Sequence, residues 1–372
     1  MGFSATNFNL PQKSQVYITF KVVPASLPKK AKVFISGNHE KLGNWNSGAV
    51  PMKKNKDGSW TKTLSFKSGT HLEYKITLGS WAKEALDKSG HVPPNSVLFV
   101  KTNATVTTVV DKWKSGEFKG KGQIAGNLKV HHNMKYEGIL PRDVLVWLPK
   151  NYEESSQKKY PVLYMHDGQQ LFDPATSTHG VDWQVDETVS KLVEQGKMKE
   201  IIVVGINNTD DRWQEYSETT KGRAYRNFVI KKLKPFIDKT YRTRPEREHT
   251  GVMGSSMGGL VSFLFVWYHP ETFSMASCLS PAFIEGDILE KVKNYKGGVK
   301  NIKIYIDNGG LGLEKKLQPG CEEMLELLEK QGFVQGENLI WFRDKKAEHN
   351  EAAWAKRVWK PLLYMYGIGE QK

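Results

Sequence analysis

The feature that most constrains the fold is a series of apolar, β-branched runs separated by stretches with helical spacing. These runs lie at residues 143–149, 160–168, 201–207, 250–256, 274–280, 302–307 and 339–344. Runs that are apolar throughout predict strands buried on both faces, and such strands occur in parallel sheets covered by helices. We therefore expect an α/β fold with a mostly parallel, doubly wound sheet. Residues 185–196, 225–241 and 321–332 have amphipathic spacing and predict three of the helices.

The first part of the chain has a different pattern. From residue 16 to 113, short β-type runs alternate with Gly, Asn, Asp and Pro, and no long helical segment occurs. Such spacing predicts a small all-β sandwich, immunoglobulin-like in type. Residues 114–127 are rich in Gly and Lys and poor in apolar side chains, as in a linker. We thus expect a β domain at 1–113, a linker at 114–127 and an α/β domain at 128–372.

Composition excludes several classes of protein. Of the 372 residues, 39% are hydrophobic and 25% are charged, which is ordinary globular usage. No apolar run approaches the roughly 20 residues that span a bilayer, so we expect no membrane association. The net charge of +14 comes from scattered lysines without a nucleic-acid-binding motif, which predicts a solvated basic surface and no nucleic-acid partner.

The compartment is left open by the sequence. The chain starts without a basic stretch followed by an apolar one, so we find no secretory signal. A secreted or periplasmic protein is expected if a signal was removed, and a cytoplasmic one otherwise. The two cysteines, Cys278 and Cys321, are too few for a disulfide framework and do not decide the question.

A GxSxG pattern lies between one predicted strand and one predicted helix. The pattern, Gly254 to Gly258, follows the run TGVM and precedes GLVSFLFVWYH. A strand, a tight turn and a helix form a nucleophile elbow, where small residues permit a strained turn and a close backbone approach. The context predicts Ser256 as the nucleophile, with the Met257 amide facing a developing oxyanion.

A serine nucleophile needs a base, and in this strand order the acid and then the histidine follow the serine. Two histidines come after Ser256. His269 closes the predicted helix, so we expect it to cap the helix carbonyls. His349 lies in a polar loop after the last apolar run, from which its imidazole can reach the edge of the sheet. We predict His349 as the general base.

The acid is expected after the run IKIYI, in the segment DNGGLGLE. Asp307 ends the strand, where its carboxylate either acts as the acid or caps the following turn. Glu314 lies far enough along the loop to reach Nδ1 of His349. Spacing alone does not decide between the two.

The segment YMHDGQQLFD predicts a second oxyanion donor, because Gly168 lets the amide of Gln169 point inward. His166 in the same segment precedes the serine, and we expect a structural imidazole. Around the pocket we expect Asp167 and the DRWQEYS residues Arg212, Glu215 and Tyr216, which either support or recognise the substrate or form a buried structural ion pair.

We predict no metal and no cofactor. His131 and His132 are adjacent on a predicted strand and therefore point to opposite faces, which is poor metal geometry. Serine ester hydrolysis needs no cofactor.

Several motifs in one order give the α/β part a family likeness. YMHDGQQLFD, VDWQVDE, VVGINN, DRWQEYS, GSSMGGL and LSPAF, over about residues 125 to 370, resemble the esterase family that includes enterochelin, feruloyl and acetylxylan esterases, S-formylglutathione hydrolases and mycolyltransferases. The resemblance implies an α/β-hydrolase fold acting on esters, with Ser256 as nucleophile, His349 as base and the Gln169 and Met257 amides as oxyanion donors. In relatives the acid follows a glycine several residues beyond the strand. This position favours Glu314 as the acid, with Asp307 in reserve. The Gly-Thr-x-Asp motif that is common in the family is missing from this sequence.

The first domain is similar to starch-binding carbohydrate modules and to related immunoglobulin-like domains. The likeness covers about residues 14 to 113 and rests on KVFISGNHEKLGNW, LEYKITLGSW and TVTTVVDKW. It implies that Trp45 and Trp81 stack on sugar rings, with Lys75 and Asn95 as polar contacts. The alternative is that these tryptophans, like Trp60, belong to the core of the sandwich.

We therefore predict a serine carboxylic-ester hydrolase that deacylates a carbohydrate carrying acetyl or feruloyl esters. A siderophore trilactone is the alternative substrate, which the basic charge would suit. An alternative of another class is a glycan-binding protein whose hydrolase domain has lost turnover. Acyl transfer to a second alcohol depends on how the pocket excludes water, and the sequence does not reveal it.

Overall fold

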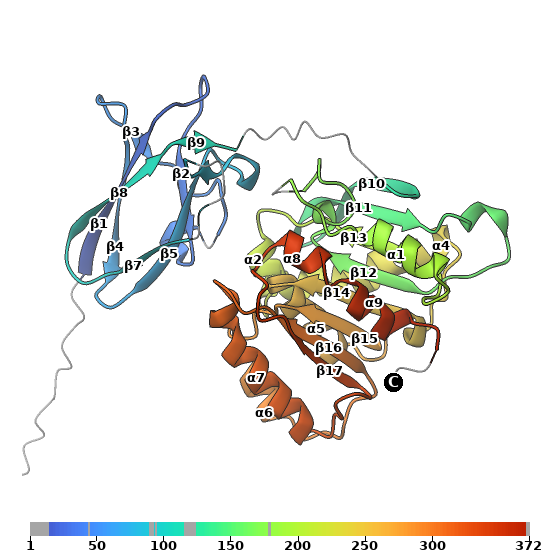
Figure 1. Cartoon of the computed structure of the whole chain (residues 1–372). Helices are drawn as coiled ribbons and strands as arrows, with labels where there is room; N and C mark the ends of the chain where they lie inside the picture. The colour runs from blue at the N-terminus through green and yellow to red at the C-terminus, as the bar shows by residue number, and fades with distance from the viewer. Residues whose placement is uncertain are drawn as a thin grey trace, which may run out of the picture. The chain divides into compact units, whose positions relative to one another are not determined.

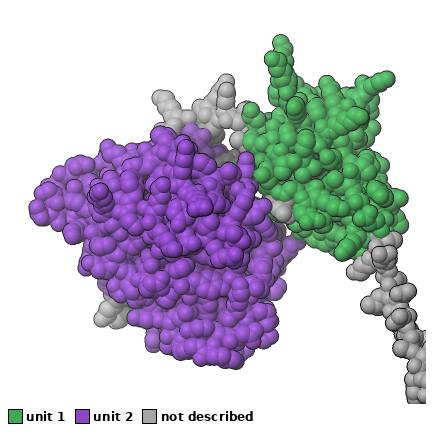
Figure 2. Space-filling model, turned by 180° about the vertical axis from the view of Figure 1, so that it is seen from behind, with its two compact units in different colours: residues 1–117 green, residues 118–372 purple. Residues whose placement is uncertain are grey.

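The computed structural model divides the chain into two compact units, Met1–Glu117 and Phe118–Lys372 (Figures 1 and 2). It describes residues 15–43, 45–88, 93, 95–114, 124–177 and 180–369. Most of the predicted linker, at residues 115–123, lies outside the described residues. Each unit has a hydrophobic core of its own.

Unit 1 is built from β-strands in two main sheets. The first has the order β3 (Lys53–Lys54), β4 (Trp60–Lys67), β1 (Gln15–Pro24), β8 (Ala104–Val110). The second has the order β2 (Phe34–Gly37), β5 (His71–Thr77), β7 (Ser96–Phe99). A short pair joins β6 (Ala85–Leu86) to β9 (Lys112–Trp113). Two 3₁₀ turns, η1 (Glu40–Leu42) and η2 (Trp81–Lys83), lie between strands.

The two main sheets of unit 1 enclose one core. Phe20 of β1 packs edge-on against Phe66 of β4 at 6.4 Å between ring centroids, and against Tyr74 of β5 at 5.0 Å. All three rings are buried. Because β1 and β5 belong to different sheets, these contacts place the two sheets face to face, as the alternating apolar runs predict.

Unit 2 contains one sheet of eight strands. Their order is β10 (Asn127–Tyr136), β11 (Ile139–Leu148), β13 (Ile202–Ile206), β12 (Val162–His166), β14 (Thr250–Ser255), β15 (Met275–Leu279), β16 (Lys303–Asn308), β17 (Leu339–Arg343). β11 is antiparallel to both of its neighbours, and from β13 to β17 every pair is parallel. The carboxyl ends of six consecutive parallel strands therefore meet at one edge.

Helices cover both faces of this sheet (Figure 1). One face packs on α3 (Thr220–Phe228), α4 (Lys234–Thr240), α5 (Met257–Tyr268), α6 (Ile288–Lys293) and α7 (Glu314–Lys330). The other packs on α1 (Val185–Glu194), α8 (Glu351–Ala355) and α9 (Trp359–Tyr366). Alternation along β11 sends Val144 and Val146 to the first face and Leu145 and Trp147 to the second. Within the described residues, no helix combines the length and apolar character needed to cross a bilayer.

Two predicted helices differ in detail from the structure. The segment 225–241 is interrupted by a π-helical stretch, Val229–Leu233, ahead of α4. Pro235 in the first turn of α4 lacks an amide hydrogen and would clash with the carbonyl four residues earlier, and the wider π turn relieves that clash. The helix predicted from residue 321 begins at Glu314 instead. Glu314 is therefore in the first helical turn and not in a loop.

Since each unit has its own core, we expect Phe20→Ala to destabilise unit 1 alone. Loss of a fully buried phenylalanine costs about 3–5 kcal/mol. Calorimetry or chemical denaturation should show a lower transition for unit 1 and an unchanged one for unit 2. Tyr17→Ala, at a half-exposed aromatic position on the same strand, is the control and should shift neither transition by more than about 0.5 kcal/mol.

Candidate active site

The predicted functional residues gather at the carboxyl edge of the unit 2 sheet because of strand register. Ser255 at the end of β14 pairs with Leu279 of β15, which pairs with Asp307 of β16. The next residue along β14 is Ser256, and the next along β15 is Ser280. Adjacent parallel strands ending at the same level thus bring together segments that are far apart in the sequence.

The turn after β14 is strained at Ser256. Its backbone has φ 58° and ψ −122°, and α5 begins directly after it. A side-chain-bearing residue in this region costs about 1–3 kcal/mol, and such strain is concentrated at functional sites. A Cβ on Gly254 would lie 2.7 Å from the Gly258 carbonyl carbon, so the turn closes only without a side chain there. This is the geometry of the predicted elbow.

The two amides predicted as oxyanion donors lie directly after β14 and β12. Met257 is the first residue of α5, so its N–H is one of the four that have no partner inside the helix. Gln169 lies in the 3₁₀ turn η4 (Gly168–Gln170) that follows β12. A Cβ on Gly168 would meet the backbone of Gly205 at 2.6 Å, so a glycine is required for this turn to lie against β13. The helix N-terminus adds a partial positive charge.

His349 and Glu314 are in direct contact. Nδ1 of His349 lies 3.1 Å from Oε1 of Glu314, and the Glu314 side chain is fully buried. The imidazole also packs edge-on against Trp354 of α8 at 5.0 Å. A carboxylate on Nδ1 keeps Nε2 as the nitrogen available for proton transfer, which is the arrangement that a general base requires.

The Glu314 carboxylate is held by two further donors. The backbone N–H of Gly309 donates to Oε2 at 2.8 Å, and the hydroxyl of Ser280 lies 2.7 Å from Oε1. Burial alone would raise the pKa of Glu314. The hydrogen bond and the charge of His349, together with the hydrogen bonds from Ser280 and Gly309, outweigh this effect of burial. They lower the pKa of Glu314 below its usual value.

The direction of the Ser280 hydrogen bond follows from its other partners. Trp354 Nε1 and Arg357 Nη2 lie 3.0 and 2.8 Å from Oγ of Ser280, and both groups can only donate. A hydroxyl oxygen has two lone pairs, so these two donors occupy both. The hydroxyl hydrogen must then be donated to Glu314. Ser280 itself has a positive φ of 43° at the end of β15.

Asp307, the reserve acid, has a different partner. Its carboxylate receives two hydrogen bonds from Arg357, at 3.0 and 3.1 Å, and both side chains are buried. The structure gives it no hydrogen bond to His349. The expected turn-capping role is also not seen, because the backbone of the following segment is held by Glu314 through Gly309. Asp307 thus orients Arg357, which in turn donates to Ser280.

The DRWQEYS residues form two ion pairs. Arg212 donates to both carboxylate oxygens of Asp167, at 2.7 and 2.8 Å, beside the elbow. Burial would raise the pKa of Asp167, but Arg212 and a hydrogen bond from Asn208 lower it. Arg212 keeps about a third of its side chain exposed, so a contact of Arg212 with substrate is compatible with the structure.

For Glu215 and Tyr216 the sequence left open a contact with substrate, support of the pocket wall or a buried ion pair. Both are fully buried, and Glu215 pairs with the buried Arg142 through both carboxylate oxygens. The Tyr216 hydroxyl accepts a hydrogen bond from the Asp167 amide. These two side chains lie behind the pocket residue Asp167 and have structural contacts, which is one of the alternatives that the sequence left open.

The other histidines have structural contacts. His166 is buried, with Nδ1 2.7 Å from the Tyr225 hydroxyl and its ring stacked on Phe265, and burial lowers its pKa to about 3. The His269 amide donates to the Phe265 carbonyl at the end of α5. Nε2 of His131 lies 2.7 Å from the Tyr241 hydroxyl.

One carboxylate cluster lies elsewhere in unit 2. Asp182, Asp186 and Glu187 offer ligand atoms within 4.8 Å of one another. Burial raises the pKa of Asp186 to about 8, and its proximity to Glu187 adds to this effect. The raised pKa of Asp186 lowers the negative charge of this cluster near neutral pH.

In unit 1, the two tryptophans named from the sequence lie side by side outside the core. The ring centroids of Trp45 and Trp81 are 6.3 Å apart with an angle of 42° between the planes, and both side chains are partly exposed. Trp60, in contrast, is a core residue. Lys75 contacts Glu84 at 3.2 Å and Asn95 contacts Glu73 at 3.1 Å, so both polar groups already have carboxylate partners.

Sequence reasoning missed Ser280, Trp354 and Arg357. One signal for Ser280 was available, because it directly follows an apolar strand whose neighbour in a parallel sheet ends at the nucleophile. Arg357 lies in the segment after α8, and nothing in the local sequence connects it with Asp307. That contact exists only because the terminal helices return to the sheet edge.

The Asp307–Arg357 pair yields a stability prediction. Asp307→Asn should lower the free energy of unfolding of unit 2 by about 3–5 kcal/mol, because it leaves the Arg357 charge buried without an anionic partner. Glu326→Gln, which breaks an exposed ion pair with Lys330 in the same unit, is the control and should cost less than about 1 kcal/mol. Denaturant titrations that show equal losses for the two variants would contradict the structural role of Asp307.

Comparisons with known proteins were made for the whole chain. Residues 140–362 match the family model described as "Putative esterase", and residues 15–110 match the starch binding domain model. The endo-1,4-β-xylanase/feruloyl esterase of Xylanibacter ruminicola is 28% identical over 338 residues, which is 86% of this chain and 41% of that protein. The chain thus spans less than half of that relative.

Solved structures share the fold. A ferulic acid esterase superposes with a TM-score of 0.54 at 20% identity, covering 64% of this chain and 97% of that one. The enterobactin esterase of Shigella flexneri, solved in the presence of enterobactin, has a TM-score of 0.56 at 14% identity, covering 96% and 94% of the two chains. These likenesses show an α/β-hydrolase-like fold preceded by a β domain. Since the matching family model covers more than half of its residues, the chain belongs to this esterase family and is an ester hydrolase.

Proposed function

We propose that the protein is a serine esterase that removes acyl groups from a carbohydrate through an acyl-enzyme on Ser256. The observation that carries the proposal is the contact of His349 with the buried Glu314 at the sheet edge that also holds the strained Ser256 turn. His349 takes the Ser256 proton as Oγ attacks the ester carbonyl, and the Met257 and Gln169 amides hold the oxyanion. The alcohol leaves with that proton, and water then cleaves the acyl-enzyme with His349 again as base.

Glu314 is the acid in this proposal and Asp307 is not. Glu314 contacts the imidazole, and its depressed pKa keeps it ionised at neutral pH, so it stabilises the imidazolium that forms. Arg212, anchored on Asp167, is the side chain we assign to the substrate pocket.

An acylated polysaccharide is favoured as the substrate class because a starch-binding-type domain precedes the esterase unit. We propose that Trp45 and Trp81 present their faces to sugar rings, since flat aromatic surfaces exclude water from the apolar face of a pyranose. Lys75 and Asn95 are weaker candidates because Glu84 and Glu73 already engage them. The immunoglobulin-like class of this domain stays a prediction from its sequence.

A siderophore trilactone is the second candidate substrate. The observation that favours it is the structural likeness to the enterobactin esterase, which extends over both units. The net charge of +14 would also attract an anionic catecholate complex. The remaining alternative is a glycan-binding protein that does not hydrolyse esters. Such a protein would bind a glycan, and Ser256 would not be activated.

Labelling with a fluorophosphonate probe, followed by peptide mapping, tests the nucleophile. We expect one adduct on Ser256 and none in Ser256→Ala or His349→Ala, whose hydrolysis rates should fall by about 10³-fold or more. Rates on a feruloylated arabinoxylan oligosaccharide, an acetylated xylan oligosaccharide and enterobactin then rank the substrates. A chain that stays unlabelled while a known serine esterase is labelled under the same conditions would refute the catalytic proposal.

The Ser280 hydrogen bond yields a kinetic prediction. Ser280→Ala should lower kcat by about 10-fold, because one hydrogen bond to a charged acceptor is worth about 1.5–3 kcal/mol and part of it acts on the imidazolium form. Loss of this donor also raises the pKa of Glu314. The acid limb of the pH–rate profile should therefore move to higher pH.

The control for Ser280→Ala is Ser277→Ala, which removes another buried hydroxyl from the same strand, one bonded to Met365 instead of the carboxylate. It should leave the acid limb of the pH–rate profile in place. An equal shift of that limb in both variants would mean that the effect is structural and not transmitted through Glu314.

The sugar-binding proposal is tested with insoluble starch and xylan. Trp45→Ala and Trp81→Ala should each weaken binding about 10-fold in a depletion assay, because each removes one stacking surface. Tyr17→Ala, a half-exposed aromatic residue on β1, should bind as the parent does. Equal binding by all three variants would place any glycan site elsewhere.

A further inference from the structure

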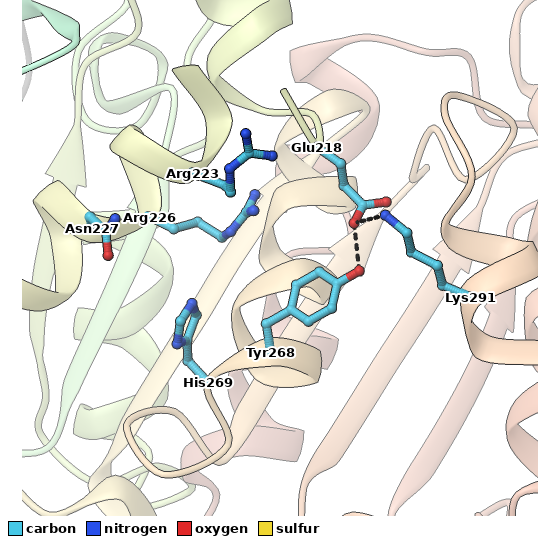
Figure 3. Close-up of a pocket in the computed structure, with 7 residues that line it drawn as sticks. All are labelled: Glu218, Arg223, Arg226, Asn227, Tyr268, His269 and Lys291. Carbon is cyan, nitrogen blue, oxygen red and sulfur yellow. Dashed lines mark hydrogen bonds and ion pairs between the residues drawn. The ribbon is translucent and has the colours of Figure 1, made fainter. Parts of the chain in front are cut away.

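A pocket lies in unit 2 at the C-terminal end of α5. The pocket there has a volume of about 350 Å³ and is lined by Glu218, Arg223, Arg226, Asn227, Tyr268, His269 and Lys291 (Figure 3). α5 begins next to Ser256 and ends at Tyr268, so at 1.5 Å per residue the pocket lies about 18 Å from the nucleophile. It is therefore separate from the candidate active site.

Arg226 of α3 is the unusual residue in this pocket. Only 5% of its surface is exposed, yet its one hydrogen bond is a long contact of 3.4 Å from Nη1 to the carbonyl oxygen of Ser217. No carboxylate of the described residues lies within ion-pair distance of it. Burial lowers the pKa of Arg226, and the charge of Glu218 offsets that only in part. Buried charges in proteins are normally paired, so a guanidinium in this state lacks an anion.

Glu218, the carboxylate in the lining of this pocket, already has other partners. Oε1 of Glu218 accepts hydrogen bonds from the Tyr268 hydroxyl and, at 2.7 Å, from Lys291. Figure 3 shows these two contacts on one side of the pocket and both guanidinium groups on the other. Glu218 thus forms its ion pair with Lys291, and its charge offsets the burial of Arg226 only in part.

A second guanidinium increases the positive charge. Arg223 lies one helical turn before Arg226 on α3, is exposed, and bonds only to the Thr220 hydroxyl at 3.1 Å. Its charge contributes to the lowered pKa of Arg226. Like charges one turn apart destabilise a helix, so the presence of both arginines with no carboxylate of the described residues within ion-pair distance of either again points to a missing anion. The imidazole of His269 completes the wall, and burial lowers its pKa below the usual value.

We propose that this pocket binds a compact oxyanion between Arg223 and Arg226. The chemistry is that of a carboxylate or phosphate group, because a planar guanidinium donates two parallel hydrogen bonds to either. Two sources supply such a group, the uronic acid of an acidic polysaccharide and a phosphorylated small molecule. The site does not depend on the proposed catalytic function.

A structural explanation competes with this one. Cations near the C-terminal end of a helix stabilise its last carbonyls, and α5 ends at this pocket. That explanation predicts that removal of Arg226 destabilises the protein, and it predicts no response to an added anion. The oxyanion site predicts that removal of Arg226 does not destabilise the protein and that an added anion stabilises it.

Thermal unfolding of the full chain separates the two explanations. Inorganic phosphate and sodium glucuronate are each compared with sodium chloride at equal ionic strength. We expect the midpoint of unit 2 to rise by about 2–4 °C at roughly five times the Kd of the better anion. A larger response to glucuronate assigns a uronic acid, and a larger response to phosphate assigns a phosphoryl group.

Arg226→Met should abolish this response and, without added anion, should leave the midpoint equal to or above that of the parent, because it removes a buried charge that has no ion-pair partner. Lys239→Met, which removes an exposed positive charge from α4, is the matched control and should keep the response. Arg223→Met alters an exposed side chain, so it does not threaten folding, and it should weaken the response about 10-fold in Kd.

A response retained in both arginine variants, or absent in the parent with both anions, would overturn the site. Destabilisation by Arg226→Met without an anion response would establish the helix-capping explanation instead. Ester hydrolysis is expected to be unchanged in these variants because the pocket is remote from Ser256. Failure of this proposal is thereby distinguishable from failure of the catalytic one.

Discussion

The buried Glu314 carboxylate is the group on which the active-site arrangement depends. An ionised carboxylate without solvent is stable only if its oxygens are hydrogen-bonded, and here His349, Ser280 and Gly309 supply the donors. Each donor comes from a different segment of the chain. The requirement to satisfy one buried charge therefore fixes the histidine loop, the end of β15 and the start of α7 relative to one another.

The Ser280 hydroxyl is itself held in place by further hydrogen bonds. Ser280 can donate to Glu314 only because Trp354 and Arg357 fill its lone pairs, and Arg357 is held by Asp307. The two carboxylates near the imidazole thus have different roles set by their partners. A network in which each member is satisfied is rigid, and rigidity keeps the imidazole in one orientation for proton transfer.

Buried arginines in unit 2 occur both with and without a carboxylate partner. Arg142 and Arg357 each have a buried carboxylate partner that receives two hydrogen bonds. Arg226 is comparably buried and has none. The first two belong to the support of the active site, while the third lines an open pocket. The difference in pairing, more than the burial itself, distinguishes a structural arginine from one available to a ligand.

The sequence by itself predicted the strand and helix pattern, the strand–turn–helix segment around Ser256 and His349 as the base, because periodicity and turn chemistry are local properties. Spacing alone could not choose between Asp307 and Glu314, since both follow the same strand, and only the family resemblance favoured Glu314. It also left open whether Glu215 and Tyr216 contact the substrate, support the pocket wall or form a buried ion pair. Only the tertiary structure shows that Glu314 contacts His349 and that Glu215 and Tyr216 are buried, because burial and the return of Arg357 to the sheet edge arise from contacts between residues dozens of positions apart.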